Sequence, residues 1–475
     1  METSFFLKKE TIYSYSFFLY ALIIGLGLAL IGNLRFGIFL TLLPLLIFLS
    51  VKYKFFSVFL FIALLPFSYI SWFGANIMGI PGAKPFNLIG AMAVIAFFVH
   101  GARLFPNRNN NVEKKAFFYL IIYFLIFSIA IFRSLEYLSV LHQLKPNLFY
   151  SSSVRYLFSS YIKPSLQFIP FIFLIKHIRE NNDIDKAVDV ICYSCFIFSS
   201  IILLITFSNT SLIMENRNQV RELFYSYLGM HYNAIGSLYI ACYPILLCHA
   251  LYRRDLFSFV NLALAIASII LIQSRSSIGA TLFATYLFLI LCKKKSYILW
   301  FTLFLGCFVL FWLPSFLLKT LSIGINECTL DAITLGRIDY LWIPLIKEWT
   351  CDVKLFLFGK GAFGLMTSPI YIRGFTVQAT HAHNAFVNFF LNCGIIIFGL
   401  VLFFLGKYLT LAWKTGRQIN SPLFWAFFSC FISYFLGAMT QRTILPSSEN
   451  MLLFPIAALL IKHAEIHRYN FKTRE

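Results

Sequence analysis

Long apolar runs separated by short polar segments dominate the chain. Fourteen such runs can be marked, at residues 13–32, 36–51, 55–72, 86–102, 116–132, 162–175, 187–207, 233–251, 256–272, 277–292, 297–317, 386–405, 422–440 and 450–461. About 20 apolar residues in a helix cross the hydrocarbon core of a bilayer. Because several runs are shorter than this, we predict an all-α, polytopic membrane protein with about 12 to 14 transmembrane helices.

The composition excludes the other broad classes. Of the 475 residues, 60% are hydrophobic and only 12% are charged. Soluble domains carry roughly 25% charged residues, and disordered chains have low hydrophobicity. The ten cysteines are scattered along the chain and show no Cys/His spacing suited to zinc. We therefore expect neither a metal nor another cofactor.

Charge predicts the orientation of the chain. The 39 Lys and Arg outnumber the 19 Asp and Glu, which gives a net charge of +20. The basic residues lie mainly in short loops between apolar runs, so they indicate membrane orientation and not nucleic-acid binding. With the N-terminus in the cytoplasm, every short cytoplasmic loop is basic. We predict an even number of spans with both termini cytoplasmic. No cleavable signal peptide is expected, since no small-residue cleavage site follows the first run.

The longest segment outside the runs, residues 318–385, is predicted to be a small helical cap on the outer face. It divides the chain into residues 1–317, with eleven helices and short loops, and residues 386–475, with three helices and a cytoplasmic tail. Cys328 and Cys351 are the two cysteines of the cap. A disulfide and two free thiols both fit, and the sequence leaves this open.

Ionisable residues are rare inside the runs, which argues against an ion-coupled transporter. The informative charges lie at the predicted outer boundary instead. Arg275 occupies a tight outer turn, and Arg337 lies in the cap close to Asp339. A guanidinium presents a fixed fork of donors that suits a diphosphate. The alternatives are an Arg275 that reaches lipid phosphate and an Arg337 on a solvated helix face.

A second group of polar residues, Thr380-His381-Ala382-His383-Asn384, leads directly into an apolar run. An imidazole with an orienting partner can act as a general base, although a satisfied interfacial histidine is the plainer interpretation. His-x-His without a third ligand is weak evidence for a metal. Weaker binding candidates are Lys84 in an outer loop and Arg217 with Arg221, which lie one helical turn apart.

Together these segments resemble the O-antigen ligase-like superfamily, which includes O-antigen ligases, O-antigen polymerases and protein O-oligosaccharyltransferases. The resemblance covers residues 225–440. The ligase pattern of His, then Asn, Ser or Gln, then nine residues and Gly is met by His383, Asn384 and Gly394, but Ile397 stands where that pattern has Gly, Thr or Tyr. The matching segments are Gly229-Met-His-Tyr-Asn233, Ser274-Arg275-Ser276, Gly336-Arg337 with Trp342, Gly359-Lys-Gly361 and His383-Asn384.

The resemblance implies a glycosyltransferase of the bacterial inner membrane, with multiple membrane helices, a periplasmic cap and an active site facing the periplasm. Its donor would be a glycan on undecaprenyl diphosphate. By resemblance, Arg275 and Arg337 would neutralise the leaving diphosphate, and His383 would be the general base. His381 would orient His383 or bind glycan together with Asn384, Lys84, Arg217 and Arg221. No metal is implied.

The acceptor stays open. A ligase transfers the glycan to a lipid A–core sugar, whereas a polymerase transfers it to a second lipid-linked repeat unit. The His-Asn-x9-Gly match favours the ligase, and Ile397 favours the polymerase. A polysaccharide flippase or other transporter is the alternative outside the superfamily, followed by a membrane scaffold. Membrane lipid is the expected surrounding partner, and nucleic acid is not expected.

Overall fold

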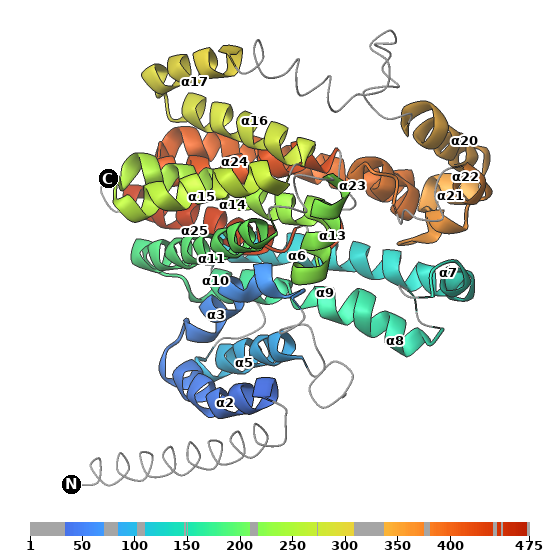
Figure 1. The fold of residues 1–475 in the computed structure, drawn as a ribbon, viewed down its shortest axis with the longest axis horizontal. Helices are drawn as coiled ribbons and strands as arrows, with labels where there is room; N and C mark the ends of the chain where they lie inside the picture. The colour runs from blue at the N-terminus through green and yellow to red at the C-terminus, as the bar shows by residue number, and fades with distance from the viewer. Residues whose placement is uncertain are drawn as a thin grey trace.

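The computed structural model describes residues 34–70, 84–101, 110–146, 149, 151–209, 217–272, 274–307, 337–374, 381–439, 444–447 and 450–472. In these residues the secondary structure is helical and contains no strand (Figure 1). The prediction of an all-α protein is therefore confirmed for the described part of the chain. The apolar run at 13–32 lies outside the described residues, and the thirteen others coincide with helices over their described parts.

The described residues form the following helical elements. In chain order they are α2 (Leu34–Lys52), α3 (Phe56–Leu64), η1 (Leu65–Phe67), α5 (Pro85–Val99), α6 (Asn111–Arg133), η3 (Ser134–Tyr137), α7 (Leu138–Leu144), α8 (Ser153–Leu157), η4 (Phe158–Ile162), α9 (Lys163–Ser165), α10 (Phe168–His177), α11 (Asn181–Ser208), α13 (Arg217–Leu228), α14 (Tyr232–Tyr252), α15 (Leu256–Ile272), α16 (Arg275–Leu291), α17 (Lys295–Cys307), η6 (Ile338–Trp342), α20 (Ile343–Cys351), α21 (Val353–Phe358), η7 (Gly364–Thr367), α22 (Pro369–Gly374), α23 (Ala385–Ile419), α24 (Pro422–Ala438) and α25 (Leu453–Lys472).

Five helical stretches are long and apolar enough to cross a membrane. They are Asn111–Leu144, Ser153–His177, Asn181–Ser208, Tyr232–Tyr252 and Ala385–Ile419, and six shorter apolar helices accompany them in the described residues. Many large apolar side chains face outward, among them Leu204 and Phe207 on α11. The chain is thus a helical protein of the multi-pass membrane type, whereas the number of 12 to 14 spans stays a prediction.

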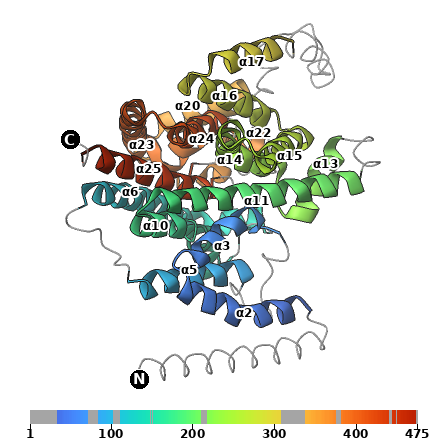
Figure 2. The same cartoon turned by 90° about the vertical axis from the view of Figure 1, so that its left-hand side faces the viewer.

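The helices pack in layers around α14. Figure 2 shows α11 crossing the middle of the molecule, with α2, α3 and α5 on one side of it and α14, α15, α16 and α24 on the other. Helix α14 is buried almost throughout and contacts α15, α16 and α24 extensively. The approach of α16 needs the small Gly236, because a Cβ there would lie 1.9 Å from the Ser277 hydroxyl.

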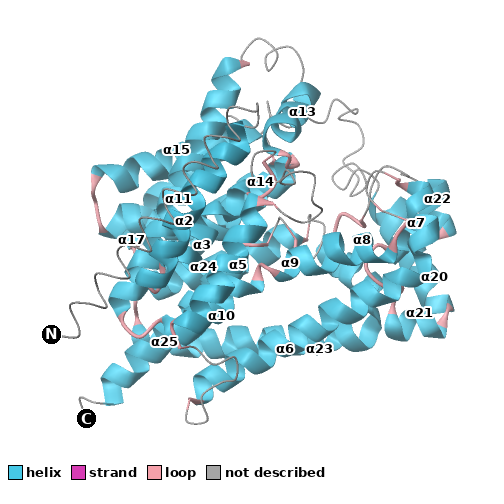
Figure 3. Cartoon of the chain, turned by 90° about the horizontal axis from the view of Figure 1, so that it is seen from below, coloured by secondary structure: helices cyan, strands magenta, loops and turns pink. Residues whose placement is uncertain are grey.

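The predicted cap, residues 318–385, and the residues that follow α6, which form η3 and α7, come together at one end of the molecule. The elements α20, α21 and α22 of the predicted cap pack beside α7, at the right of Figure 1. Helices α6 and α23 lie side by side and run toward this group (Figure 3). The described elements of this segment, η6, α20, α21, η7 and α22, are short helices, and their place outside the membrane as a cap stays a prediction. Cys328 lies outside the described residues, so its pairing is not tested.

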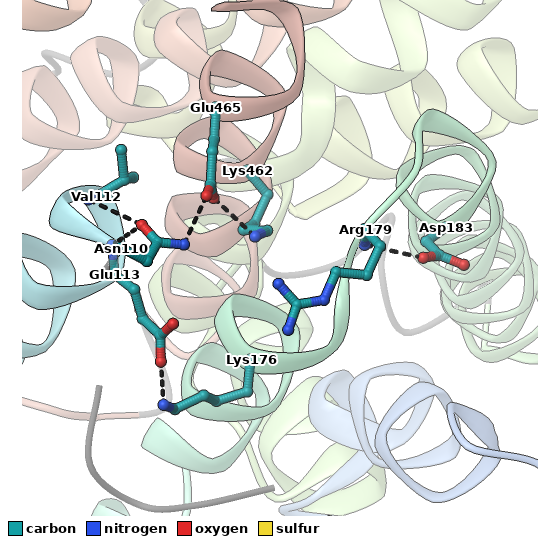
Figure 4. A network of polar contacts seen from close by, with 8 residues as sticks. All are labelled: Asn110, Val112, Glu113, Lys176, Arg179, Asp183, Lys462 and Glu465. Atoms are coloured by element: carbon teal, nitrogen blue, oxygen red, sulfur yellow. Dashed lines mark hydrogen bonds and ion pairs between the residues drawn. The ribbon is translucent and has the colours of Figure 1, made fainter. Parts of the chain in front are cut away.

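Away from the cap, a network of polar side chains joins the ends of α6, α10 and α25 (Figure 4). Asn110 caps α6 by accepting from the amides of Val112 and Glu113, and its amide group donates to Glu465 at 2.7 Å. Glu465 also pairs with Lys462 at 2.7 Å. Glu113 pairs with Lys176 of α10, and both side chains are less than one-tenth exposed.

Substitution of Glu113 by Gln should strongly lower the stability of this helix packing. Loss of the carboxylate removes the ion pair of the buried Lys176 ammonium group, which costs about 3–5 kcal/mol. Thermal unfolding of the purified protein in lipid nanodiscs measures the effect. The double variant Glu113→Leu with Lys176→Met should recover most of the loss, since no charge is then left buried. A Glu113→Gln midpoint equal to the wild-type midpoint would show that the pair does not hold these helices.

Candidate functional site

The Gly229–Asn233 and Ser274–Ser276 segments meet at one end of the α14–α16 pair. The Ser274 hydroxyl donates to the Asn233 side-chain oxygen at 3.0 Å, and Ser277 donates to Ser274 at 2.9 Å. His231 caps α14, because its Nδ1 accepts from the Asn233 amide at 3.3 Å. The structure therefore brings together two segments that lie about 40 residues apart in sequence.

Arg275 begins α16, and the tight turn predicted for this position lies between α15 and α16. Its side chain is outside the described part of the chain. The two arginines of α13, Arg217 and Arg221, lie one turn apart in that helix as predicted, and their side chains are also outside the described part. The binding roles of these three residues stay predictions.

Arg337 lies at the start of the described cap elements and is close enough to Tyr232, the first residue of α14, for an electrostatic interaction. It directly precedes η6, a turn of π-helix, and such turns occur often at functional sites. Burial lowers the pKa of the Arg337 guanidinium, and the neighbouring Tyr232 opposes this change. Among the described residues no carboxylate pairs with Arg337, and Asp339 is exposed. A half-buried guanidinium without a counter-ion is suited to bind an anionic ligand.

The histidine segment lies against the same turn. The Trp342 indole Nε1 donates to the Ala382 carbonyl at 2.6 Å, which ties η6 to the residue between His381 and His383. The two imidazole rings lie 4.3 Å apart between centroids. His381 is buried and His383 is half-buried. A φ of 56° places His383 in the left-handed region, a strained conformation that is concentrated at functional sites.

Asn384 has a defined structural role. Its side-chain oxygen accepts from the amides of Phe386 and Val387 at 3.0 and 3.2 Å, so it caps the start of α23. Asn is among the residues preferred at this position. The cap accounts for the Asn after His383 without any contact to a substrate, and the predicted substrate contact of Asn384 stays a prediction.

The Gly that closes the His-Asn-x9-Gly pattern breaks α23. Gly394 has a φ of 77°, and the helix is interrupted there. The carbonyls freed by this break accept from cap donors: Leu391 from the Lys360 amide and from the Trp349 indole, and Asn392 from the Gly361 amide. The apolar run predicted at 386–405 is therefore not one continuous helix, because its first eight residues, 386–393, belong to a helix held by the cap.

The Gly359-Lys-Gly361 motif is the other half of this junction. Gly359 and Gly361 have φ values of 67° and 85°, and a Cβ on Gly359 would lie 2.4 Å from the Asn392 carbonyl oxygen. A Cβ on Gly361 would lie 2.8 Å from the Ser134 backbone nitrogen. Lys360 lies over the ring of Trp349, 5.7 Å from its centroid. This motif consequently joins the cap to α6 and α23 through its backbone.

Gly394→Ala should loosen the junction. A Cβ at this position would lie 2.2 Å from the Leu357 carbonyl oxygen, and the positive φ alone costs on the order of 1–3 kcal/mol for a non-glycine residue. Gly399→Ala in the same helix is the matched control, because its Cβ would meet no atom within 4 Å. We expect a lower thermal midpoint for Gly394→Ala only. Equal midpoints for the two variants would refute the role of the break.

Lys84 lies apart from the arginine and histidine segments, just before α5. Burial lowers the pKa of its half-buried ammonium group. It is close enough to Lys163 of α9 for the two charges to repel each other. Sequence reasoning missed Lys163, and it named Tyr232 and Trp342 only as parts of the matching segments, without a role. The signal for Lys163 was a single lysine at the outer end of an apolar run.

An apolar cavity of about 270 Å³ lies between α6, α23, α24 and α25. Phe386 and Phe389, in the helix that begins directly after Asn384, contribute to its wall, and Phe398 and Val401 continue the wall beyond the Gly394 break. Tyr123 and Phe454 line the other side. The cavity therefore lies along the helix that follows the histidine segment, and its apolar lining is suited to a hydrocarbon chain.

Within the described part of the chain, no three His, Cys, Asp or Glu side chains come together as possible ligands of a metal ion. The side chains that converge are cationic, imidazole and hydroxyl groups. Comparison with protein-family models finds no match to this chain, and comparison with curated proteins finds no matching sequence. The assignment of a function consequently depends on the arrangement of these residues.

Proposed function

We propose that the chain is a membrane glycosyltransferase of the O-antigen ligase type, which moves a glycan from undecaprenyl diphosphate to a lipid A–core sugar at the periplasmic face of the bacterial inner membrane. One observation supports this most. The Trp342 indole of η6 donates to the Ala382 carbonyl between His381 and His383, and Arg337 directly precedes η6, close enough to Tyr232 for the two groups to interact electrostatically. The half-buried Arg337 and the two imidazoles therefore adjoin the same turn of the chain.

The chemistry requires a leaving group, a nucleophile and a base. The acceptor hydroxyl oxygen attacks the anomeric carbon of the donor, and the bond from that carbon to the diphosphate oxygen breaks. The electron pair leaves with undecaprenyl diphosphate, and direct displacement inverts the anomeric configuration. His383 takes the hydroxyl proton as general base. Arg275 and Arg337 neutralise the charge that develops on the diphosphate.

The apolar cavity gives the donor lipid a place. A polyprenyl chain is apolar along its length, and the wall formed by Phe386, Phe389 and Phe398 offers aromatic and aliphatic contacts. The first two of these side chains follow His383 within six residues. A tail in the cavity would thus leave its diphosphate near the start of α23, where the proposed base lies.

The polymerase is the second candidate, because donor and chemistry are the same and only the acceptor differs. One observation favours the polymerase: Ile397 stands where the ligase pattern has Gly, Thr or Tyr. A transporter would make no covalent product.

A lipopolysaccharide gel tests these alternatives. A strain that lacks the chain should show core-only lipopolysaccharide, with polymer accumulated on undecaprenyl diphosphate, if the protein is a ligase. Core that bears a single repeat unit would indicate a polymerase. An unchanged ladder, with the chain deleted and restored, would contradict both.

A further inference from the structure

Two lysines in the amino-terminal half of the molecule, Lys84 and Lys163, are close enough for their charges to act on each other, and Lys163 adjoins the Gly229–Asn233 segment through Tyr69. Lys163 begins α9 directly after η4, the second turn of π-helix in the described residues. Its Nζ lies 4.3 Å from the centroid of the Tyr69 ring. Lys84 is the residue before α5, and the charges of Lys84 and Lys163 act on each other. Both side chains are half-buried.

The lysine pair adjoins the Gly229–Asn233 segment through Tyr69. Gly229 has a φ of 64°, and a Cβ there would lie 2.3 Å from the Tyr69 carbonyl oxygen. The ring of the same tyrosine holds Lys163. The segment therefore touches the lysine group at Gly229 and interacts with Arg337 at Tyr232. The two cationic groups are separate, and each lies beside the start of α14.

No acid balances the lysine pair in the described part of the chain. The ion pairs found there involve Lys176, Arg253 and Lys462. The connecting residues 71–83, which precede Lys84, contain no Asp or Glu. Two like charges in a partly buried place destabilise each other, and a bound anion would offset this cost.

We propose that Lys84 and Lys163 form a second anion-binding subsite, which takes a phosphate group of the acceptor lipid. The inference rests on the proposed function, in which the arginines hold the donor diphosphate. Transfer needs a second lipid at the same face, and both acceptors considered are phosphorylated: lipid A–core on its lipid, and a lipid-linked repeat unit at its diphosphate. With this subsite, the acceptor lipid must carry a phosphate group, whether it is lipid A–core or a lipid-linked repeat unit.

Native mass spectrometry of the protein released from nanodiscs can count the bound lipids. The probes are lipid A–core, the same lipid after removal of its phosphates, the undecaprenyl diphosphate repeat unit, and phosphatidylglycerol. We compare wild type with Lys84→Gln and Lys163→Gln. Lys354→Gln is the matched control, since Lys354 is exposed on α21 in the cap. Lys163→Arg keeps the charge and checks that a loss is not due to misfolding.

Loss of a charge-assisted phosphate contact should weaken acceptor binding about tenfold for each Gln variant. Lys354→Gln and Lys163→Arg should bind like wild type. If the Gln variants bind phosphorylated lipid A–core more weakly and the other lipids as before, the result supports the subsite with a ligase acceptor. If they bind one repeat-unit lipid where wild type binds two, the result supports the subsite with a polymerase acceptor.

Three results would overturn the subsite: equal binding by Lys and Gln variants, the same loss for dephosphorylated lipid, or the same loss for phosphatidylglycerol. Wild-type transfer is measured separately in the same nanodiscs. An inactive wild type counts against the proposed function, whereas an active wild type with unchanged binding in the Gln variants counts against the lysine subsite alone.

Discussion

His383→Gly should abolish at least about 99% of glycan transfer, because a positioned general base contributes roughly 10²- to 10⁴-fold to a rate. Glycine is the informative replacement, since it adopts the φ of 56° at this position without strain and so preserves the backbone that Trp342 holds at Ala382. The loss can then be assigned to the imidazole. The measurement is the initial rate of product formation by the variant in nanodiscs at saturating donor.

His381→Ala provides the comparison for this experiment. His381 is buried against the ring of His383, so we expect it to orient that ring and to cause a smaller loss when removed. Membrane insertion and thermal midpoint should stay near the wild-type values in His383→Gly. A well-folded His383→Gly protein that transfers glycan within about threefold of wild type would remove His383 from the mechanism.

Arg337→Lys should lower turnover by about 10²- to 10³-fold, the range found when one donor to a developing negative charge is removed. Lysine keeps the charge but loses the planar fork that binds a diphosphate at two points. Because the contact strengthens as the leaving group departs, kcat should fall more than the affinity for donor. The same result is predicted for Arg275→Lys from its place at the start of α16.

Arg417→Lys serves as the control for both arginine variants, because Arg417 is exposed at the far end of α23 and packs on Trp413. It should leave turnover unchanged. Normal kcat with weakened donor binding in Arg337→Lys would show that Arg337 only anchors the substrate. Normal values for both parameters would exclude it from the site.

The helices could be predicted from the apolar runs because burial in lipid demands both apolar side chains and internally paired backbone groups. The break in α23 could not be predicted in this way. The apolar pattern continues through Gly394, and a helix of this composition is expected to run on. Only the donors of residues 349–361, which lie more than 30 residues earlier in the chain, satisfy the carbonyls that the break sets free.

The candidate site likewise contains features that the sequence predicts and features that it does not predict. The histidine segment was identified from residue type and its position directly before an apolar run, and Arg337 from residue type and its place in the predicted cap. The cap formed by Asn384 follows a local rule. Two other features depend on how distant helices pack, and no local pattern encodes that packing. They are the hydrogen bond from Trp342 to Ala382 and the interaction of Lys163 with Lys84.

The most direct test of the transferase is a reaction with purified components. The protein in nanodiscs receives an undecaprenyl diphosphate glycan and lipid A–core, and the products are separated by chromatography and mass. We predict a glycosylated core lipid and free undecaprenyl diphosphate in equal amounts, with neither formed by His383→Gly. Recovery of both substrates unchanged, from a folded wild-type protein that binds the donor, would contradict the proposed activity and favour a protein that moves the lipid without covalent chemistry.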